Sequence, residues 1–353
     1  MLGEVVMVMM VMIDAIASAC ITNYLFFFLL GHQTILNYSS DARKTRLRLT
    51  GFVEDKTPIA AVTAHAAADP SSFKTRAQWT SEGKTLHLLA PIYHDLFHQS
   101  RLMVPLIPIF LDFTKVGHEF GIMSNKTTAT TAYKFHVTQM KMFIRRVKTT
   151  ASTKLEIERR LAMHPARYPL TQSTMKPFYL DANQKSATFE NCFGSKGIPR
   201  YCTLMFCDQR NYRGEYSRNP FVFSHHDLVS LKISFGSDTY PSPEFRPVYT
   251  SVNEMDWSRE YLALCNSTFK SDAANMITYD DFKSKYCIYC IDLGGFSTTS
   301  NDHISPKSDV TARLDISFLS TSENPALVAL LYTEHNCEIQ VNSSRSVTRD
   351  YIL

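Results

Sequence analysis

The chain has 353 residues, enough for two ordinary domains, and its 44% hydrophobic and 20% charged residues exclude a disordered chain. Aromatic residues make up 12%, and this richness, with few long Ala/Glu/Lys/Leu runs, indicates strands. The net charge of +4 is small and dispersed, so we expect no specific binding of nucleic acid.

Residues 1–35 form a hydrophobic N-terminal segment, in which residues 5–30 are long enough to cross a membrane once. Asp14 and Asn23 lie inside this stretch, and no Lys or Arg precedes it as in a signal peptide. The stretch is apolar on nearly every face, which suits no place between two packed sheets. We therefore expect residues 1–35 to pack poorly on the rest of the chain, either because the start is misassigned or because they anchor in a membrane.

Residues 36–150 are predicted to form a partial first β-sandwich. Two short strands are expected at 85–90 and 109–113. Residues 133–147 give the clearest strand, because apolar and polar residues alternate in it and the apolar phase shifts by one residue after Gln139. We expect a long closing strand with a β-bulge at that point.

Residues 151–166 are predicted to connect two sandwiches through one helix, Ser152–Met163. Ser152 or Thr153 can cap its first turn, and Glu156 follows Thr153 at the spacing of a capping box. Pro165 ends the helix. A lone helix between two strand-rich halves is expected to lie between the two sandwiches.

Residues 167–353 are predicted to form a complete eight-stranded jelly roll. Arg313–Phe318 alternates polar and apolar residues without a break, and Ala326–Leu331 is apolar throughout, as in a strand buried on both faces. The expected strands lie near 174–180, 201–207, 229–235, 286–291, 312–318 and 326–332. The predicted core includes Ile288, Leu314, Ile316, Phe318, Val328 and Leu330.

The eight cysteines are too few and too scattered for a disulfide scaffold, and they favour a reducing intracellular compartment. Cys287 and Cys290 have the C-x-x-C spacing but lie in a predicted strand. Because residues three apart on a strand point to opposite faces, we expect two buried thiols that share no metal ion.

One constellation could form a catalytic site, that of a jelly-roll iron oxygenase. His225 and Asp227 supply an H-x-D motif, His303 could be a distal ligand, and Arg313 follows about ten residues later. The histidines lie in predicted loops, and Arg313 lies on the polar face of a strand. We therefore expect no catalytic residue, metal or cofactor, and an iron-dependent oxygenase remains an alternative.

Several segments, in consistent order from about residue 50 to residue 353, resemble one family. They include Gly51–Asp55, Phe73–Arg76, Pro91–Gln99, Met142–Lys148, Ala166–Pro169, Arg218–Phe223, Tyr286–Leu293, Val310–Phe318 and Cys337–Val347. This ordered set resembles the double jelly-roll major capsid proteins of Maverick/Polinton elements and adintoviruses, including endogenous copies in animal genomes. The chain departs from the family pattern at Lys285, where a glycine is usual, and at Cys337 and Gln340.

The resemblance implies an all-β double jelly roll of two antiparallel β-sandwiches, the first one truncated. It implies a structural capsid subunit, a shell tile without catalytic activity, from an integrated viral element. The implied partners are copies of the chain itself in a homotrimer, shell neighbours and a minor (penton) capsid protein, and the implied location is virion-like. A second alternative is a single-pass membrane protein with a cytoplasmic β-sandwich, in which only residues 5–30 meet the membrane.

Overall fold

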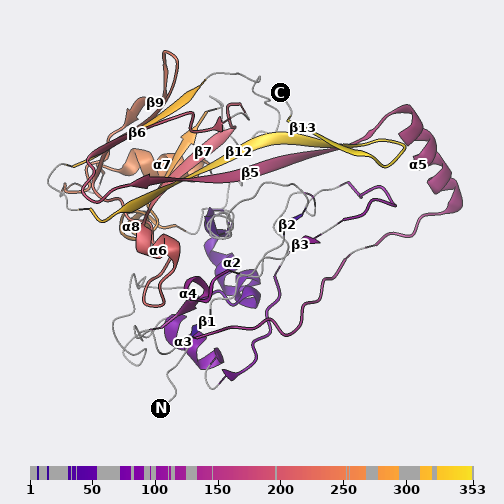
Figure 1. The fold of residues 1–353 in the computed structure, drawn as a ribbon, viewed down its shortest axis with the longest axis horizontal. Helices are drawn as coiled ribbons and strands as arrows, with labels where there is room; N and C mark the ends of the chain where they lie inside the picture. Colours follow the sequence, from indigo (N-terminus) through magenta and orange to yellow (C-terminus); the bar gives the residue numbers. More distant parts are fainter. Residues whose placement is uncertain are drawn as a thin grey trace.

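The computed structural model describes residues 6–7, 14–15, 31–32, 34–36, 38–53, 72–80, 83–90, 96, 101–109, 111–112, 116–124, 133–144, 146–194, 197–251, 253, 255–267, 277–293, 311–319 and 324–351. Two antiparallel sheets in the second half of the chain dominate this part (Figure 1). The predicted all-β class, with antiparallel sheets, is confirmed.

The two sheets contain nine strands, one more than we expected. The five-stranded sheet consists of β5 (Ala166–Leu180), β7 (Tyr201–Asp208), β10 (Ile288–Asp292), β12 (Leu327–Val341) and β13 (Val347–Tyr351). The four-stranded sheet has the order β6 (Ser186–Glu190), β11 (Ala312–Phe318), β8 (Leu228–Phe235) and β9 (Asp238–Phe245). The short helices α6 (Gln209–Arg213), α7 (Ser258–Ser267) and α8 (Tyr279–Ser284) lie in the connections between strands.

The two sheets pack face to face as a sandwich. Phe206 of β7 meets Phe318 of β11 with ring centroids 5.2 Å apart, and Phe178 of β5 meets Phe189 of β6 at 4.6 Å. Such contacts between rings of facing sheets form the core of a β-sandwich. The predicted core is confirmed, since all six of its residues are at most 5% exposed: Ile288, Leu314, Ile316, Phe318, Val328 and Leu330.

β12 is buried on both of its faces. Ala329 is the ladder partner of Phe206, so both face the second sheet, whereas Leu330 is the partner of Met205 on the opposite, outer face. Leu330 is 0% exposed and its inner-face neighbour Leu331 is 1% exposed. The apolar run of this strand therefore reflects two covered faces, as predicted.

Part of the described first half lies against the outer face of the five-stranded sheet, where His32 contacts Thr203 and Tyr332. Its elements are β1 (Val6–Met7), β2 (Asp14–Ala15), α2 (Ser40–Lys44), the 3-10 helix η1 (Arg46–Thr50), α3 (Ser72–Thr80), β3 (Leu111–Asp112), α4 (His118–Gly121) and β4 (Ile122–Met123). β1 pairs with β4, and β2 pairs with β3. Buried residues such as Leu36, Leu47 and Phe120 belong to the same hydrophobic cluster as the sandwich.

The end of the N-terminal segment is packed, contrary to our expectation. Residues 31–32 and 34–36 are helical, and His32 Nε2 lies 2.7 Å from Thr203 Oγ1 of β7. A Cβ at Gly31 would lie 2.3 Å from the Phe221 ring, so only glycine fits there without a shift. The expectation of poor packing is thus wrong for the described residues of 1–35. Most of residues 5–30 lie outside the described residues, and no described helix is long and apolar enough to cross a membrane.

Two strands predicted in the first half do not form. Residues 85–90 have no regular secondary structure, and residues 133–144 belong to no ladder despite their alternating pattern. The bulge expected at Gln139 is therefore absent too. Alternation makes a segment able to form a strand, but the strand is stable only beside a partner. Among the described residues of the first half, every strand is two residues long, too short to serve as such a partner.

The predicted helix is present as α5 (Ala151–Met163), but its cap and its place differ from the prediction. Thr150 is the N-cap, one position before the two expected residues, and its hydroxyl accepts a hydrogen bond from the Thr153 backbone N–H at 3.3 Å. Leu161 is its one buried residue. Figure 1 shows α5 at the far end of β5 and of the β12–β13 hairpin, not between two sandwiches.

Thr150→Ala is expected to fray the first turn of α5. The lost cap costs about 1 kcal/mol, which corresponds to a roughly fivefold loss of amide protection in that turn. Hydrogen exchange of the full chain measures it. Lys154→Ala, at an exposed position of the same turn, is the matched control, since alanine is a good helix former there. Equal effects of the two substitutions would show that Thr150 is not the cap.

Candidate functional site

The His225–Asp227 motif forms a tight turn that leads into β8. His226 and Asp227 have φ values of 47° and 49°, so two consecutive residues adopt the left-handed conformation. The Asp227 backbone N–H donates to His225 Nδ1 at 2.9 Å. Burial lowers the pKa of His225, against an opposing effect of the Asp227 carboxylate, so the ring is neutral. Its Nδ1 serves the turn, although it also lies 3.2 Å from Asp227 Oδ1.

Of the remaining residues of the iron-site hypothesis, Arg313 is described, and it does not lie at this turn. His303 lies outside the described residues. Asp227 O accepts from the Leu319 N–H, next to the end of β11, whereas Arg313 lies at the start of that strand. Arg313 pairs there with Asp315 at 2.9 Å and Glu190 at 3.9 Å. No group of three His, Cys, Asp or Glu side chains among the described residues could hold a metal ion.

The C-x-x-C residues point to opposite faces of the five-stranded sheet, as predicted. Cys287 Sγ lies 3.2 Å from Tyr249 OH, whereas Cys290 is the ladder partner of Thr203 on the outer face. Burial raises the pKa of Cys287 to about 12, so this thiol stays protonated and unreactive. The seven described cysteines are free thiols, and six of them are buried.

A buried polar cluster lies on the outer face, where the first half meets the sheet. Glu334 of β12 accepts hydrogen bonds from Tyr201 OH, at 2.7 Å, and from Tyr332 OH. The ring of His32 lies over Tyr332 with centroids 4.3 Å apart. Burial and the Glu334 carboxylate raise the pKa of Tyr201, so its hydroxyl remains a donor. Burial also lowers the pKa of His32 to about 3.

Sequence reasoning missed this cluster. Its groups come from the N-terminal segment, β7 and β12, which are far apart in the chain. The one available signal was the row of polar residues on alternate positions in β7 and β12, and such a row also fits a solvated face. Because the cluster is buried and each hydroxyl serves a neighbour, it can hold the first half on the sheet rather than process a ligand.

The five-stranded sheet continues beyond the sandwich as an arm. β7 pairs with Leu327–Glu334 of β12, β13 pairs with Cys337–Val341, and β5 runs along all of β12 on its other side. Figure 1 shows these strands extending to α5. Segment 101–104 is attached near the start of β5, where Arg101 Nη1 donates to Arg167 O at 2.7 Å. The arm is therefore a built part of the molecule that projects from the core.

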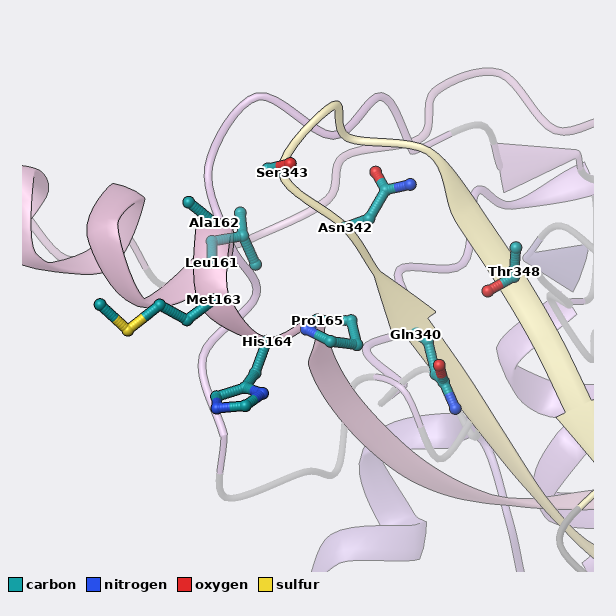
Figure 2. Close-up of a pocket in the computed structure, with 9 residues that line it drawn as sticks. All are labelled: Leu161, Ala162, Met163, His164, Pro165, Gln340, Asn342, Ser343 and Thr348. Atoms are coloured by element: carbon teal, nitrogen blue, oxygen red, sulfur yellow. The ribbon is translucent and has the colours of Figure 1, made fainter.

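A hollow of about 340 Å³ lies at the tip of the arm (Figure 2). It is lined by the end of α5 and by the β12–β13 hairpin, through Leu161, Ala162, Met163, His164, Pro165, Gln340, Asn342, Ser343 and Thr348. Asn342 Oδ1 shapes the hairpin, since it accepts from the Ser346 N–H at 2.9 Å. Arg345, with φ 63°, pairs with Glu158 of α5 and so ties helix and hairpin together. Apolar groups beside amides and hydroxyls can bind a segment of another chain.

No protein-family model matches this chain. An uncharacterized protein of Caenorhabditis elegans is 23% identical to it over 275 residues, which are 76% of this chain and 64% of that protein. The chain thus spans less than two thirds of the length of this relative.

Three solved structures are similar to the chain. A chain of the Sputnik virophage is 11% identical, with a TM-score of 0.34, over 54% of this chain and 39% of that one. VP54 of PBCV-1, fitted into a reconstruction of Sputnik, is 10% identical, with a TM-score of 0.37, over 58% and 55%. The mavirus major capsid protein is 8% identical, with a TM-score of 0.28, over 54% and 42%.

Proposed function

We propose that this chain is a structural capsid-type subunit, a shell tile that acts through contacts and not through catalysis. One observation carries the proposal. Two sequence blocks that resemble double jelly-roll capsid proteins are joined by a backbone hydrogen bond, although they lie far apart in the chain. These blocks are Arg218–Phe223 and Tyr286–Leu293. The Cys287 N–H donates to Phe223 O at 3.0 Å, and Phe223 forms an isolated parallel bridge with Tyr286.

Two further blocks coincide with strands of the same sandwich. Val310–Phe318 contains β11, and Cys337–Val347 covers the end of β12 and the start of β13. Blocks that are scattered along the sequence are thus elements of one antiparallel sandwich. This supports the resemblance, because a family pattern of that kind should follow the strands of the fold.

The partners that follow from this proposal are copies of the chain in a homotrimer, shell neighbours and a penton protein, in a virion-like particle from an integrated viral element. A tile needs rigid faces that its neighbours can meet. The arm supports such a role, because paired strands stiffen it and a hollow opens at its tip.

The full chain is expected to form trimers and larger shell-like assemblies. Sedimentation velocity and negative-stain electron microscopy measure this. A chain that stays monomeric over the whole accessible concentration range contradicts the proposal.

Ser343→Trp should weaken this association at least about tenfold, because the indole would fill the hollow at the arm tip. Ser237→Trp, in the exposed turn between β8 and β9, is the matched control and should leave it unchanged. Equal assembly of the two variants would place the contacts elsewhere on the surface.

A further inference from the structure

Residues 136–149 are here named the basic segment. The described residues of the segment, 136–144 and 146–149, run extended and exposed on the way to α5 (Figure 1). All their described side chains are exposed, with Phe143 at 83% and Ile144 at 66%. Among the described residues, no backbone hydrogen bond involves the segment. A run of large apolar side chains with open backbone groups is costly to leave in water, which indicates a binding surface.

The segment is suited to form a strand and lacks the prolines that two edge strands of the sandwich, β5 and β9, contain. β5 contains Pro169 and Pro177, and β9 contains Pro241 and Pro243. Proline on an edge strand removes a donor and blocks the approach of another strand. The basic segment contains no proline. Its backbone can therefore pair over its whole length.

The charge of the segment indicates which kind of chain can pair with it. It contains Lys141, Arg145, Arg146 and Lys148 and neither Asp nor Glu. A second copy is a poor partner, because antiparallel pairing centred on Phe143 sets Lys141 opposite Arg145 twice. Like charges directly opposite each other destabilise a strand pair, whereas a carboxylate opposite a lysine or arginine stabilises it.

We propose that the basic segment binds, by strand addition, an extended segment of a different protein in which acidic and apolar residues alternate. The partner strand satisfies the backbone groups, its carboxylates pair with Arg146 and Lys148 on one face, and its apolar side chains cover Phe143 on the other face. This interaction does not rest on the capsid proposal, because it depends only on the exposure, pattern and charge of residues 136–149.

The test measures binding of capped synthetic peptides to the full chain by fluorescence anisotropy. A peptide of alternating Glu and Val is expected to bind at least about tenfold tighter than one of alternating Lys and Val. The Glu/Val peptide with N-methylated backbone amides should lose binding, because it cannot form a ladder. Hydrogen exchange should slow at residues 136–149 when the Glu/Val peptide binds.

Charge reversal in the chain tests the location of the site. Arg146→Glu combined with Lys148→Glu should weaken binding of the Glu/Val peptide about tenfold or more. Lys154→Glu combined with Arg159→Glu, on the exposed surface of α5, is the matched control and should change it less than about twofold.

Each opposite result overturns the proposal. Equal binding of the Glu and Lys peptides, unchanged binding after N-methylation, or equal loss in both double variants excludes an acidic strand at this segment. If the Glu/Val peptide does not bind and the wild-type chain binds phosphatidylserine vesicles instead, the partner of the segment is a lipid surface. If residues 136–149 are protected from hydrogen exchange without any peptide, and this protection rises with the concentration of the chain, the partner is a second copy of the chain.

Discussion

Leu330→Ala is expected to lower the free energy of unfolding by about 3 kcal/mol, as much as Leu331→Ala. The two leucines are neighbours in β12 but lie on opposite faces of the five-stranded sheet. Leu331 faces the second sheet, and any sandwich buries it. Leu330 is fully buried because the outer face is also covered, on the side where His32 reaches β7.

Urea unfolding of the full chain measures both losses. Leu155→Ala on α5, where the leucine is 72% exposed, is the control of the same type and should cost less than about 0.5 kcal/mol. A cost for Leu330→Ala as small as that of Leu155→Ala would mean that the outer face is open in solution and that the first half does not cover it.

Acidification from pH 7 to pH 5 is expected to destabilise the chain through His32. Burial lowers the pKa of this histidine to about 3, from the 6.5 of an exposed imidazole. Its Nδ1 has no hydrogen-bond partner among the described residues, so a proton added there would be buried and unpaired. His226 acts in the same direction, because burial lowers its pKa to about 4.

The direction follows from proton uptake. Above pH 6.5 His32 is neutral in both the folded and the unfolded chain, and stability does not depend on it. Between pH 6.5 and about pH 3 the unfolded chain takes up a proton that the folded chain refuses. The free energy of unfolding therefore falls with pH in this window, by about 1.4 kcal/mol per pH unit for one such histidine.

His32→Gln removes the titrating group. The unfolding midpoint of this variant should therefore depend less steeply on pH, by the contribution of one histidine. The slope is the readout, because the substitution also changes stability at neutral pH. His164→Gln, at an exposed position after α5, should leave the slope of the wild type. A slope that is the same in wild type and His32→Gln would show that His32 is not buried in solution.

Several elements could be predicted because their signals are local. The alternation of Arg313–Phe318 determines which side chains of β11 share a face, and the structure buries the apolar ones. Helix α5 begins near hydroxyl side chains and ends before Pro165, so its bounds could be predicted within about one residue. The spacing of Cys287 and Cys290 was enough to put them on opposite faces of a strand.

The candidate sites depended on distant neighbours and were harder to predict. The H-x-D spacing of His225 and Asp227 fits a ligand pair, but two left-handed residues turn it into the entrance of β8. His32 follows a long apolar run, and nothing in its surroundings along the chain indicates Thr203 or Tyr332 as its partners. Lowering of its pKa is a result of burial, which only the packed structure provides.

The sequence by itself determined which segments can form strands, which residues of a strand share a face, and which residues form helix α5. Only the tertiary structure decided which of those segments are paired. Residues 133–147 alternate on both sides of one phase shift, and Arg313–Phe318 alternates without a break. β11 has β6 and β8 beside it, whereas the described residues of 133–147 have no ladder partner. The physical reason is that periodicity is a property of neighbouring residues, while a strand is stabilised by hydrogen bonds and side-chain contacts to residues far away in the chain.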